Sequence, residues 1–293
     1  MIHYARNSEL EIAVRQPGAE LGSIKSLKSG IEYMWDFTPS IWPSTAPVLF
    51  PIVGPLLDGY YLWEGEKYTL PRHGFIRDNP LLLLTGITAD SLTFGIQTSK
   101  ETLKVYPFDF EFSICFKLDG NKIKVIHTVA NKGNSNMYFS MGAHPAFRCP
   151  IHADEQYDDY YLEFETAENS STWLSHENGG LSDQTLPIFN NSKILPLTHD
   201  LFSRDALIFK DLKSRKITLM SKKSTQSLSV SFEGFPQMGI WAKTNGDFVC
   251  IEPWIGYADR WDTDHEFKTK EGLIELAGGA TFEATYIIEI NEK

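Results

Sequence analysis

Apolar and polar residues alternate along several segments of the chain. In residues 108–118 every second position is apolar, from Phe108 to Leu118. A period of two predicts a β-strand with one buried face, and the Asp-Gly-Asn at 119–121 predicts a tight turn into a return strand that begins with residues 123–129. Residues 282–290 repeat the alternation near the end of the chain. These patterns indicate antiparallel strands, two of them joined in a hairpin.

Shorter segments between Gly, Pro and Ser turns extend this pattern toward the N-terminus. Residues 10–14, 19–27 and 31–37 each predict a short strand. No segment shows convincing helical periodicity, and no glycine-rich phosphate loop opens a helix. Residues 167–200 form the most polar stretch, which we expect to be a long surface excursion. We therefore predict an all-β fold, a large antiparallel β-sandwich, with residues 1–293 in a single domain.

One predicted strand carries a carboxylate between two apolar faces. In FVCIEPWIGYADRWD, residues 248–262, Cys250 and Glu252 point to one face while apolar residues occupy the other. We expect this strand to be covered on both sides and its ladder pairing to end at Pro253. A buried carboxylate costs free energy unless a partner or a reaction uses it. By itself, Glu252 is equally well explained as a structural hydrogen-bond acceptor.

Composition and charge exclude several kinds of partner. The formal net charge of −11 argues against nucleic acid and anionic membranes as main partners, because both need clustered basic residues. The N-terminal residues contain no apolar run long enough for a signal peptide, and no segment approaches a membrane span. Three scattered cysteines are too few for a disulfide framework or a zinc ribbon. A cytoplasmic location is the simplest interpretation.

Three positions carry groups suited to proton transfer. His73 stands in LPRHGFIRD (70–78), His144 in SMGAHPAF (140–147), and Glu252 on the predicted buried strand. Histidine suits the role of general acid at physiological pH, and a glutamate can serve as base. Each signal alone is weak, because a histidine beside glycine or proline is more often a turn residue. His127 lies on an apolar strand face and is predicted to be a core histidine.

Other kinds of site have less support. Zinc sites use sets of His and Glu, but the sequence contains no HExxH motif and no close histidine pair on one strand, so we expect no metal. A serine hydrolase of the nucleophile-elbow type would need GxSxG, which does not occur. The aromatic residues around Glu252, among them Trp254, suit stacking against a sugar. A tryptophan at a strand end is also an ordinary core residue.

Five motifs follow one another along the chain: FPIVG (50–54), PRHGF (71–75), GAHPAF (142–147), DALIF (205–209) and IEPWIG (251–256). Together they resemble the aldose 1-epimerase (galactose mutarotase) family, and most closely its LacX-like branch. The resemblance covers almost the whole chain. The HGF and GAHPAF pieces with a downstream EPW are its specific part. The family fold is a large antiparallel β-sandwich, which agrees with the strand pattern.

The resemblance implies proton shuttling without a cofactor. The glutamate matching Glu252 takes the proton from the C1 hydroxyl of a sugar, and the histidine matching His144 protonates the ring oxygen. The ring then opens, the aldehyde rotates, and reclosure gives the other anomer. The histidine matching His73 helps to bind and polarise the ring-oxygen side, and the aspartate matching Asp205 holds sugar hydroxyls. Our expectation is an aldose 1-epimerase whose partner is a small-molecule hexose.

One position departs from the family pattern and affects the choice of substrate. Relatives often carry an arginine after the FPIVG glycine, where it contacts the sugar, whereas this chain has Pro55. Arg72 or Arg77 could supply a positive group nearby, and an arginine fork would also suit a sugar phosphate. Two alternatives therefore stand beside hexose epimerisation. They are a hexose-6-phosphate 1-epimerase, and a sugar-binding or regulatory protein of the same fold that has lost turnover.

Overall fold

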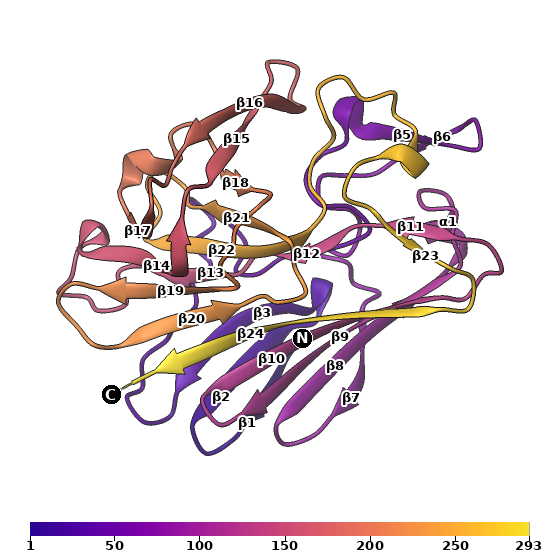
Figure 1. Ribbon diagram of the computed structural model, residues 1–293. Coiled ribbons are helices and arrows are strands. Elements are labelled where there is room, and N and C mark those ends of the chain that lie inside the picture. Colours follow the sequence, from indigo (N-terminus) through magenta and orange to yellow (C-terminus); the bar gives the residue numbers. More distant parts are fainter. Residues whose placement is uncertain (293) are drawn as a thin grey trace.

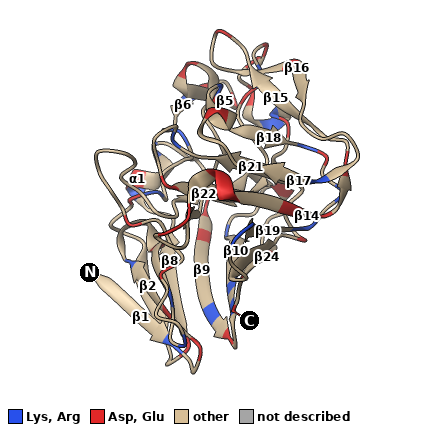
Figure 2. Ribbon diagram, turned by 90° about the vertical axis from the view of Figure 1, so that its left-hand side faces the viewer, with Lys and Arg blue, Asp and Glu red and all other residues tan. Residues whose placement is uncertain are grey.

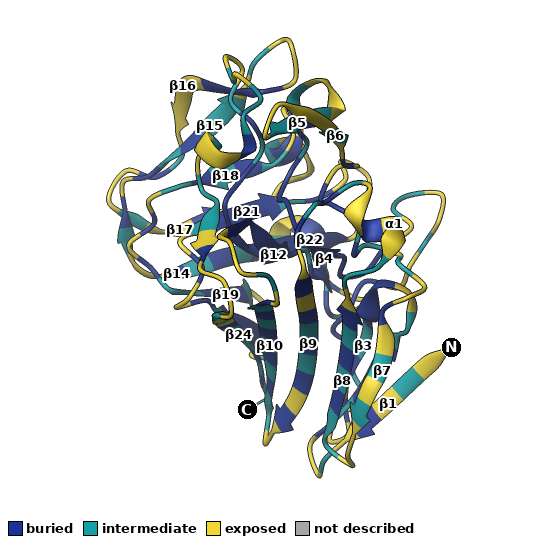
Figure 3. Cartoon of the chain, turned by 90° about the vertical axis from the view of Figure 1, so that its right-hand side faces the viewer, coloured by how far each residue is buried: buried dark blue, intermediate teal, exposed yellow. Residues whose placement is uncertain are grey.

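The largest sheet of the protein is antiparallel and has nine strands. The structure is a computed structural model that describes residues 1–292. The spatial order of the strands is β17 (Ser192–Pro196), β14 (Tyr160–Glu168), β19 (Lys216–Ser221), β20 (Ser227–Ser231), β24 (Thr281–Asn291), β10 (Lys122–Asn131), β9 (Phe110–Asp119), β8 (Ser91–Gln97) and β7 (Leu83–Ile87). The predicted hairpin is confirmed, since Asp119 pairs with Lys122 across the turn. Figure 3 shows the alternation of buried and exposed residues along β9.

A second antiparallel sheet lies beside the first and contains the strand with the carboxylate. Its strands are β18 (Leu207–Phe209), β21 (Gln237–Trp241), β22 (Phe248–Ile255), β12 (Met141–Ala143) and β4 (Val48–Leu49), with β13 (Ala146–Arg148) also paired to β22. All eight residues of β22 are buried, which confirms that this strand is covered on both faces. In Figure 1, β22 crosses the molecule between the nine-stranded sheet and the hairpins that project beyond it.

The expectation that ladder pairing ends at Pro253 is wrong. Pro253 pairs with Met238 of β21, and Trp254 pairs with Gln237 one step further on. A proline removes a single N–H donor, so neighbouring residues can hold the register around it. The pairing therefore carries Trp254 past the proline on the same strand as Glu252.

Smaller elements complete the described part of the chain. They are a three-stranded sheet of β1 (Ile2–Arg6), β2 (Leu10–Arg15) and β3 (Glu20–Ser26), and the pairs β5 (Tyr60–Trp63) with β6 (Glu66–Thr69), β11 (Met137–Phe139) with β23 (Ile274–Leu276), and β15 (Ser171–Ser175) with β16 (Leu181–Pro187). Helical segments are short: α1 (Lys100–Leu103), and the 3-10 turns η1 (Pro17–Ala19), η2 (Leu57–Gly59), η3 (Tyr157–Asp159), η4 (His199–Phe202) and η5 (Phe267–Thr269). Within residues 1–292, no helix is long and apolar enough to span a membrane.

Two sequence predictions differ from the structure. Residues 31–37 form no strand and make only two isolated bridges. The Glu32 carboxylate accepts the backbone N–H groups of Ile24 and Met34, at 2.8 and 2.9 Å, so a side chain replaces part of the expected ladder. Residues 167–200 are not a simple surface excursion, because they contain the β15–β16 hairpin and β17.

The all-β fold class is confirmed, and one continuous hydrophobic core joins the two large sheets. This core includes Phe112 of β9 and Ile251 of β22, both with no exposed surface. His127 of β10 is also fully buried, as its apolar strand face predicts. Figure 2 shows basic residues scattered among acidic ones over the side in view. This distribution agrees with the acidic net charge.

Candidate active site

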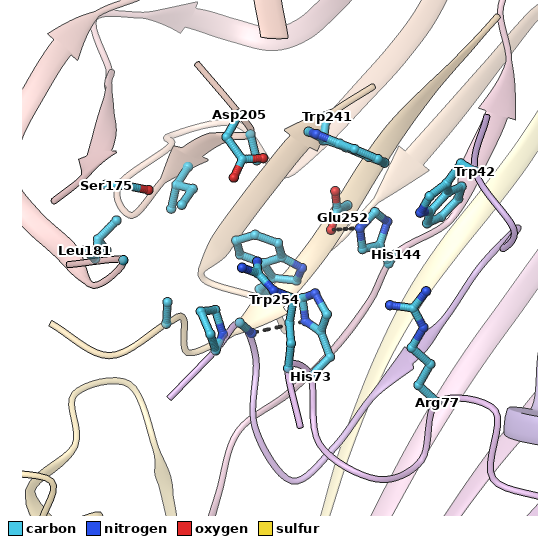
Figure 4. A pocket seen from close by; sticks show the side chains of 17 residues that line it. Trp42, His73, Arg77, His144, Ser175, Leu181, Asp205, Trp241, Glu252 and Trp254 are labelled. Atoms are coloured by element: carbon cyan, nitrogen blue, oxygen red, sulfur yellow. Dashed lines mark hydrogen bonds and ion pairs between the residues drawn. The ribbon is translucent and has the colours of Figure 1, made fainter. Parts of the chain in front are cut away.

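The register of the second sheet brings His144 and Glu252 together. Strands β12 and β13 both pair with β22, and His144 lies in the short gap between them. Gly142 is paired with Trp254, so two further steps along this antiparallel register place His144 opposite Glu252. The His144 Nε2 and Glu252 Oε2 atoms are 3.3 Å apart (Figure 4). Two residues more than 100 positions apart in sequence thus meet across one strand pair.

Glu252 is a buried acid at the floor of a cavity. Its side chain is 1% exposed, and Oε2 has no hydrogen-bond partner among the residues that the structure describes. On the other side of β22 its cross-strand neighbour is Gly239, which has no side chain to cover it. Burial, and then the negative charge of Asp205, raise the pKa of the Glu252 carboxyl well above its usual value.

His144 is held by aromatic rings. The Trp42 indole stacks on its imidazole with ring centroids 5.0 Å apart, and Trp241 meets the same ring edge-on at 5.6 Å. Its Nδ1 is buried without a hydrogen-bond partner within residues 1–292. Burial, and then the positive charge of Arg77, lower the pKa of the His144 imidazole to about 3. The ring orientation therefore depends on packing more than on hydrogen bonding.

The two pKa shifts both act against charge on this pair of residues. A lowered imidazole pKa and a raised carboxyl pKa both favour the uncharged forms, in which His144 is neutral and Glu252 keeps its proton. Moving that proton across the 3.3 Å contact produces imidazolium and carboxylate without changing the charge of the site. Both the neutral and the charged arrangement of the pair place one proton donor and one proton acceptor beside the cavity.

His73 adds a hydrogen-bond donor of fixed tautomer. The Gly54 backbone N–H donates to His73 Nδ1 at 3.1 Å, so the neutral ring carries its proton on Nε2. Burial is the main cause that holds the His73 pKa well below its usual value, so the ring stays neutral. The next residue must be a glycine, because a Cβ at Gly74 would lie 2.1 Å from the Phe50 carbonyl oxygen. This close approach explains the glycine of the HGF motif.

Trp254 covers two glycines of neighbouring strands and forms part of the cavity lining. A Cβ added at Gly239 would lie 2.5 Å from its indole, and one added at Gly142 would lie 2.8 Å from it. The indole therefore lies close against both backbones, beside Glu252 in Figure 4. The glycine of the GAHPAF motif thus has a physical reason, which is room for this ring.

The cavity has a volume of about 250 Å³ and collects every residue that the sequence predicts for the site. Its lining includes Glu252, His144, His73, Asp205, Arg72, Arg77 and Trp254. The volume lies just below the range of about 300–1,000 Å³ that is typical for drug-sized ligands, so the cavity suits a small ligand. Pro55 also lines it, at the position where relatives often carry arginine.

The rim of the cavity is more exposed than its floor. Asp205 is exposed and has a positive φ of 87°, and Arg72 is exposed as well. Arg77 is half-buried and donates to the Ser44 hydroxyl at 3.0 Å. Its Nε also lies 3.5 Å from the Asp78 carboxylate. Of the two predicted arginines, Arg72 is thus the one without an ion pair among residues 1–292.

Sequence reasoning missed part of the cavity lining. Trp42 and Trp241 flank His144, and the β15–β16 hairpin contributes Ser175, Gly179 and Leu181. The hairpin belongs to the polar stretch that the sequence assigns to the surface. Trp42 stands among three prolines in residues 39–47. Because proline restricts the backbone, these prolines were a local signal that the loop holds Trp42 in a defined position.

The fold and the site define a class of protein: a large antiparallel β-sandwich with a histidine–glutamate pair at the floor of a cavity for a small ligand. The chain belongs to the aldose 1-epimerase family, whose sequence model matches residues 1–287. It is 35% identical over 294 residues to the plasmid-encoded protein LacX of Lactococcus lactis subsp. lactis, covering 97% of this chain and 98% of that protein.

Solved structures agree with this assignment. A galactose mutarotase related enzyme from Lactobacillus acidophilus has a TM-score of 0.93 at 33% identity, with 100% of this chain and 98% of that chain covered. A galactose mutarotase-like protein from Lactobacillus casei has a TM-score of 0.92 at 27% identity, with 99% and 100% covered. The resemblance deduced from the five motifs is therefore confirmed, and the family is one of isomerases.

Proposed function

We propose that this protein interconverts the α and β anomers of a hexose by acid–base ring opening and reclosure. The observation that carries the proposal is the 3.3 Å contact between His144 Nε2 and Glu252 Oε2 at the floor of the cavity. Epimerisation at C1 needs one proton removed and one delivered on either side of the C1–O5 bond. An imidazole and a carboxyl group side by side can do both, one as acid and the other as base, and can then exchange roles.

In the proposed reaction, the Glu252 carboxylate accepts the proton of the C1 hydroxyl while His144 donates a proton to the ring oxygen. The C1–O5 bond breaks and C1 becomes an aldehyde. After rotation about C1–C2, the ring oxygen attacks the other face of the aldehyde. His144 then takes the hydroxyl proton back and Glu252 returns its proton to O1. Each such transfer contributes on the order of a hundred- to ten-thousandfold to the rate.

Other residues have binding roles in this proposal. His73 presents an Nε2–H donor to the ring-oxygen side, because its Nδ1 is already occupied by Gly54. Asp205 accepts hydrogen bonds from sugar hydroxyls at the exposed rim. Trp254 offers an indole to the apolar face of the sugar, as aromatic rings commonly do for ligands with C–H faces.

A hexose 6-phosphate is the second candidate substrate, and one observation favours it. Arg72 lines the cavity, is exposed, and makes no ion pair within residues 1–292. Its guanidinium is free to bind a phosphate with two parallel hydrogen bonds. Arg77 adds positive charge to the same rim, although Ser44 and Asp78 already occupy part of its hydrogen-bonding capacity.

The experiment that tests the proposal is the rate of anomer equilibration, followed by polarimetry or proton NMR. Fresh α-glucose, α-galactose and glucose 6-phosphate are each mixed with wild-type protein and with Glu252→Gln. We expect wild type to accelerate equilibration and the variant to lose at least about a hundredfold, because a neutral amide cannot accept the C1 proton. A variant that keeps more than about a tenth of the rate would show that Glu252 is not the base. Binding heat without acceleration would identify a sugar-binding protein instead.

A further inference from the structure

The face of β22 that carries Glu252 also carries a cysteine. Cys250 lies two residues before Glu252 and is a free, fully buried thiol. Its Sγ, a ring nitrogen of His144 and a carboxylate oxygen of Glu252 all lie within 4.8 Å of one another. The mechanism proposed above gives Cys250 no role. Sulfur, imidazole nitrogen and carboxylate oxygen are together the donor set that suits zinc and similar thiophilic cations.

The geometry points to an inhibitory site for a thiophilic divalent cation such as Zn²⁺, formed by His144, Cys250 and Glu252. Zinc–ligand bonds of about 2.0–2.3 Å at tetrahedral angles separate neighbouring ligand atoms by roughly 3.3–3.8 Å. The 3.3 Å separation of His144 Nε2 and Glu252 Oε2 already falls in that range. A movement of the thiol by about 1 Å brings the third ligand atom into range.

Binding of the cation displaces the protons of the Cys250 thiol and the Glu252 carboxyl, which pass to solvent, because metal ligands must be deprotonated. Glu252 Oε2 is buried without a hydrogen-bond partner in the described chain, so a cation would satisfy an acceptor that is otherwise unpaired. Three protein ligands leave the fourth position of a tetrahedral ion open, as in zinc sites that keep a water or ligand position. Glu252 and His144 both line the cavity, so an ion can reach them from there.

A bound cation would block epimerisation because it occupies the atoms that transfer the protons. The lone pair of Glu252 Oε2 and that of His144 Nε2 would both be directed to the metal. The His144 Nδ1–H would then have no acceptor, since no partner for Nδ1 exists among residues 1–292. Metal-binding histidines usually have such a partner, and its loss costs 10- to 100-fold in affinity. We therefore expect reversible inhibition by added metal and removal of the metal by chelators.

Direct binding is tested with Co²⁺, which reports sulfur coordination by its absorption spectrum without reference to turnover. We expect wild-type protein to develop a thiolate-to-cobalt charge-transfer band that Zn²⁺ removes. The matched variants are Cys250→Ala and Cys149→Ala, since Cys149 is also a free, fully buried cysteine but lies outside the cluster. The band should disappear only in Cys250→Ala. A wild-type protein without the band, or a band that survives in Cys250→Ala, would overturn the site.

The inhibition experiment rests on the proposed function and is separable from the binding experiment. Epimerisation is measured against Zn²⁺ concentration, each protein being compared with its own metal-free rate, with Mg²⁺ as the hard-cation control. We expect Cys250→Ala to need at least tenfold more Zn²⁺ than wild type for half-inhibition. Cys250→Ser should also need more Zn²⁺ than wild type. Mg²⁺ should have no effect on any of these proteins. Equal Zn²⁺ sensitivity of Cys250→Ala and Cys149→Ala would contradict the proposal. A cobalt band in a protein without epimerase activity would refute the proposed function and leave the metal site standing.

Discussion

Two histidines of this protein have similarly lowered pKa values but different surroundings: His127 is fully buried, and the His144 side chain is 12% exposed. His127 of β10 and His144, between β12 and β13, both have an imidazole pKa lowered to about 3, mainly by burial. His127 lies on the inner face of the nine-stranded sheet with Phe112, Phe235 and Tyr286 within 6.3 Å of its ring centroid. Neither of its ring nitrogens has a hydrogen-bond partner in the described residues.

His144 differs from His127 because it has a carboxylate beside it and lines a cavity. Its Nε2 lies 3.3 Å from the Glu252 carboxylate, and both residues line the cavity. A lowered pKa alone therefore does not identify a residue that transfers protons, because burial lowers it equally in an inert core. A partner with the opposite shift and room for a ligand make the difference. The comparison predicts that changes at the two histidines have separate effects on turnover and on stability.

We expect the largest effect on turnover, with little effect on stability, from His144→Asn. Asparagine can remain in contact with Glu252 but cannot deliver a proton at neutral pH. The rate of anomer equilibration should fall on the order of a hundredfold or more. Thermal unfolding followed by circular dichroism should show a folded protein. Near-normal turnover in this variant would mean that the acid lies elsewhere and would remove the distinction between the two histidines.

A smaller effect is expected at Trp42, which stacks on His144 at a centroid distance of 5.0 Å. An aromatic face stabilises a nearby cation by roughly 0.5–2 kcal/mol, and here the cation is the imidazolium form that donates the proton. Trp42→Leu should lower kcat about tenfold, within the factor that this energy allows. Trp42→Phe keeps a ring and should recover most of the loss. If leucine and phenylalanine behave alike, then the stacked ring does not support the acid.

Much of the fold and the floor of the site could be predicted because their signals are local. The period-two segments predicted β9, β10 and β24, and the motifs singled out His73, His144 and Glu252, which line one cavity in the structure. The cross-strand register, by contrast, depends on hydrogen bonds between distant segments. For the same reason, sequence reasoning missed Trp42, which reaches His144 from about 100 residues away. Residues 31–37 were misread because the Glu32 side chain, which sequence patterns do not weigh, takes the place of a ladder partner.

The smallest effect on turnover is expected from His127→Phe, which should change stability instead. Phenylalanine has a similar shape and removes two unpartnered nitrogens from a core of rings, where such groups cost about 1–3 kcal/mol. Its epimerase rate should match that of wild type, because no cavity residue is altered. Its free energy of unfolding at pH 7 should be higher by about 1 kcal/mol. A large loss of turnover would show that His127 acts on the site after all.

The pH dependence of that stability difference is diagnostic. The His127 pKa is about 3 in the folded protein and 6.5 in the ordinary imidazole, so between these values the unfolded chain binds a proton that the native protein does not. Wild type should therefore lose about 1.4 kcal/mol per pH unit through His127 as the pH falls below 6.5. His127→Phe lacks this contribution, while the similar shift of His144 is present in both proteins and cancels. In urea unfolding between pH 8 and pH 5, the advantage of the variant should be constant above pH 6.5 and grow below it. An advantage that stays constant down to pH 5 would mean that His127 already binds a proton in the folded core.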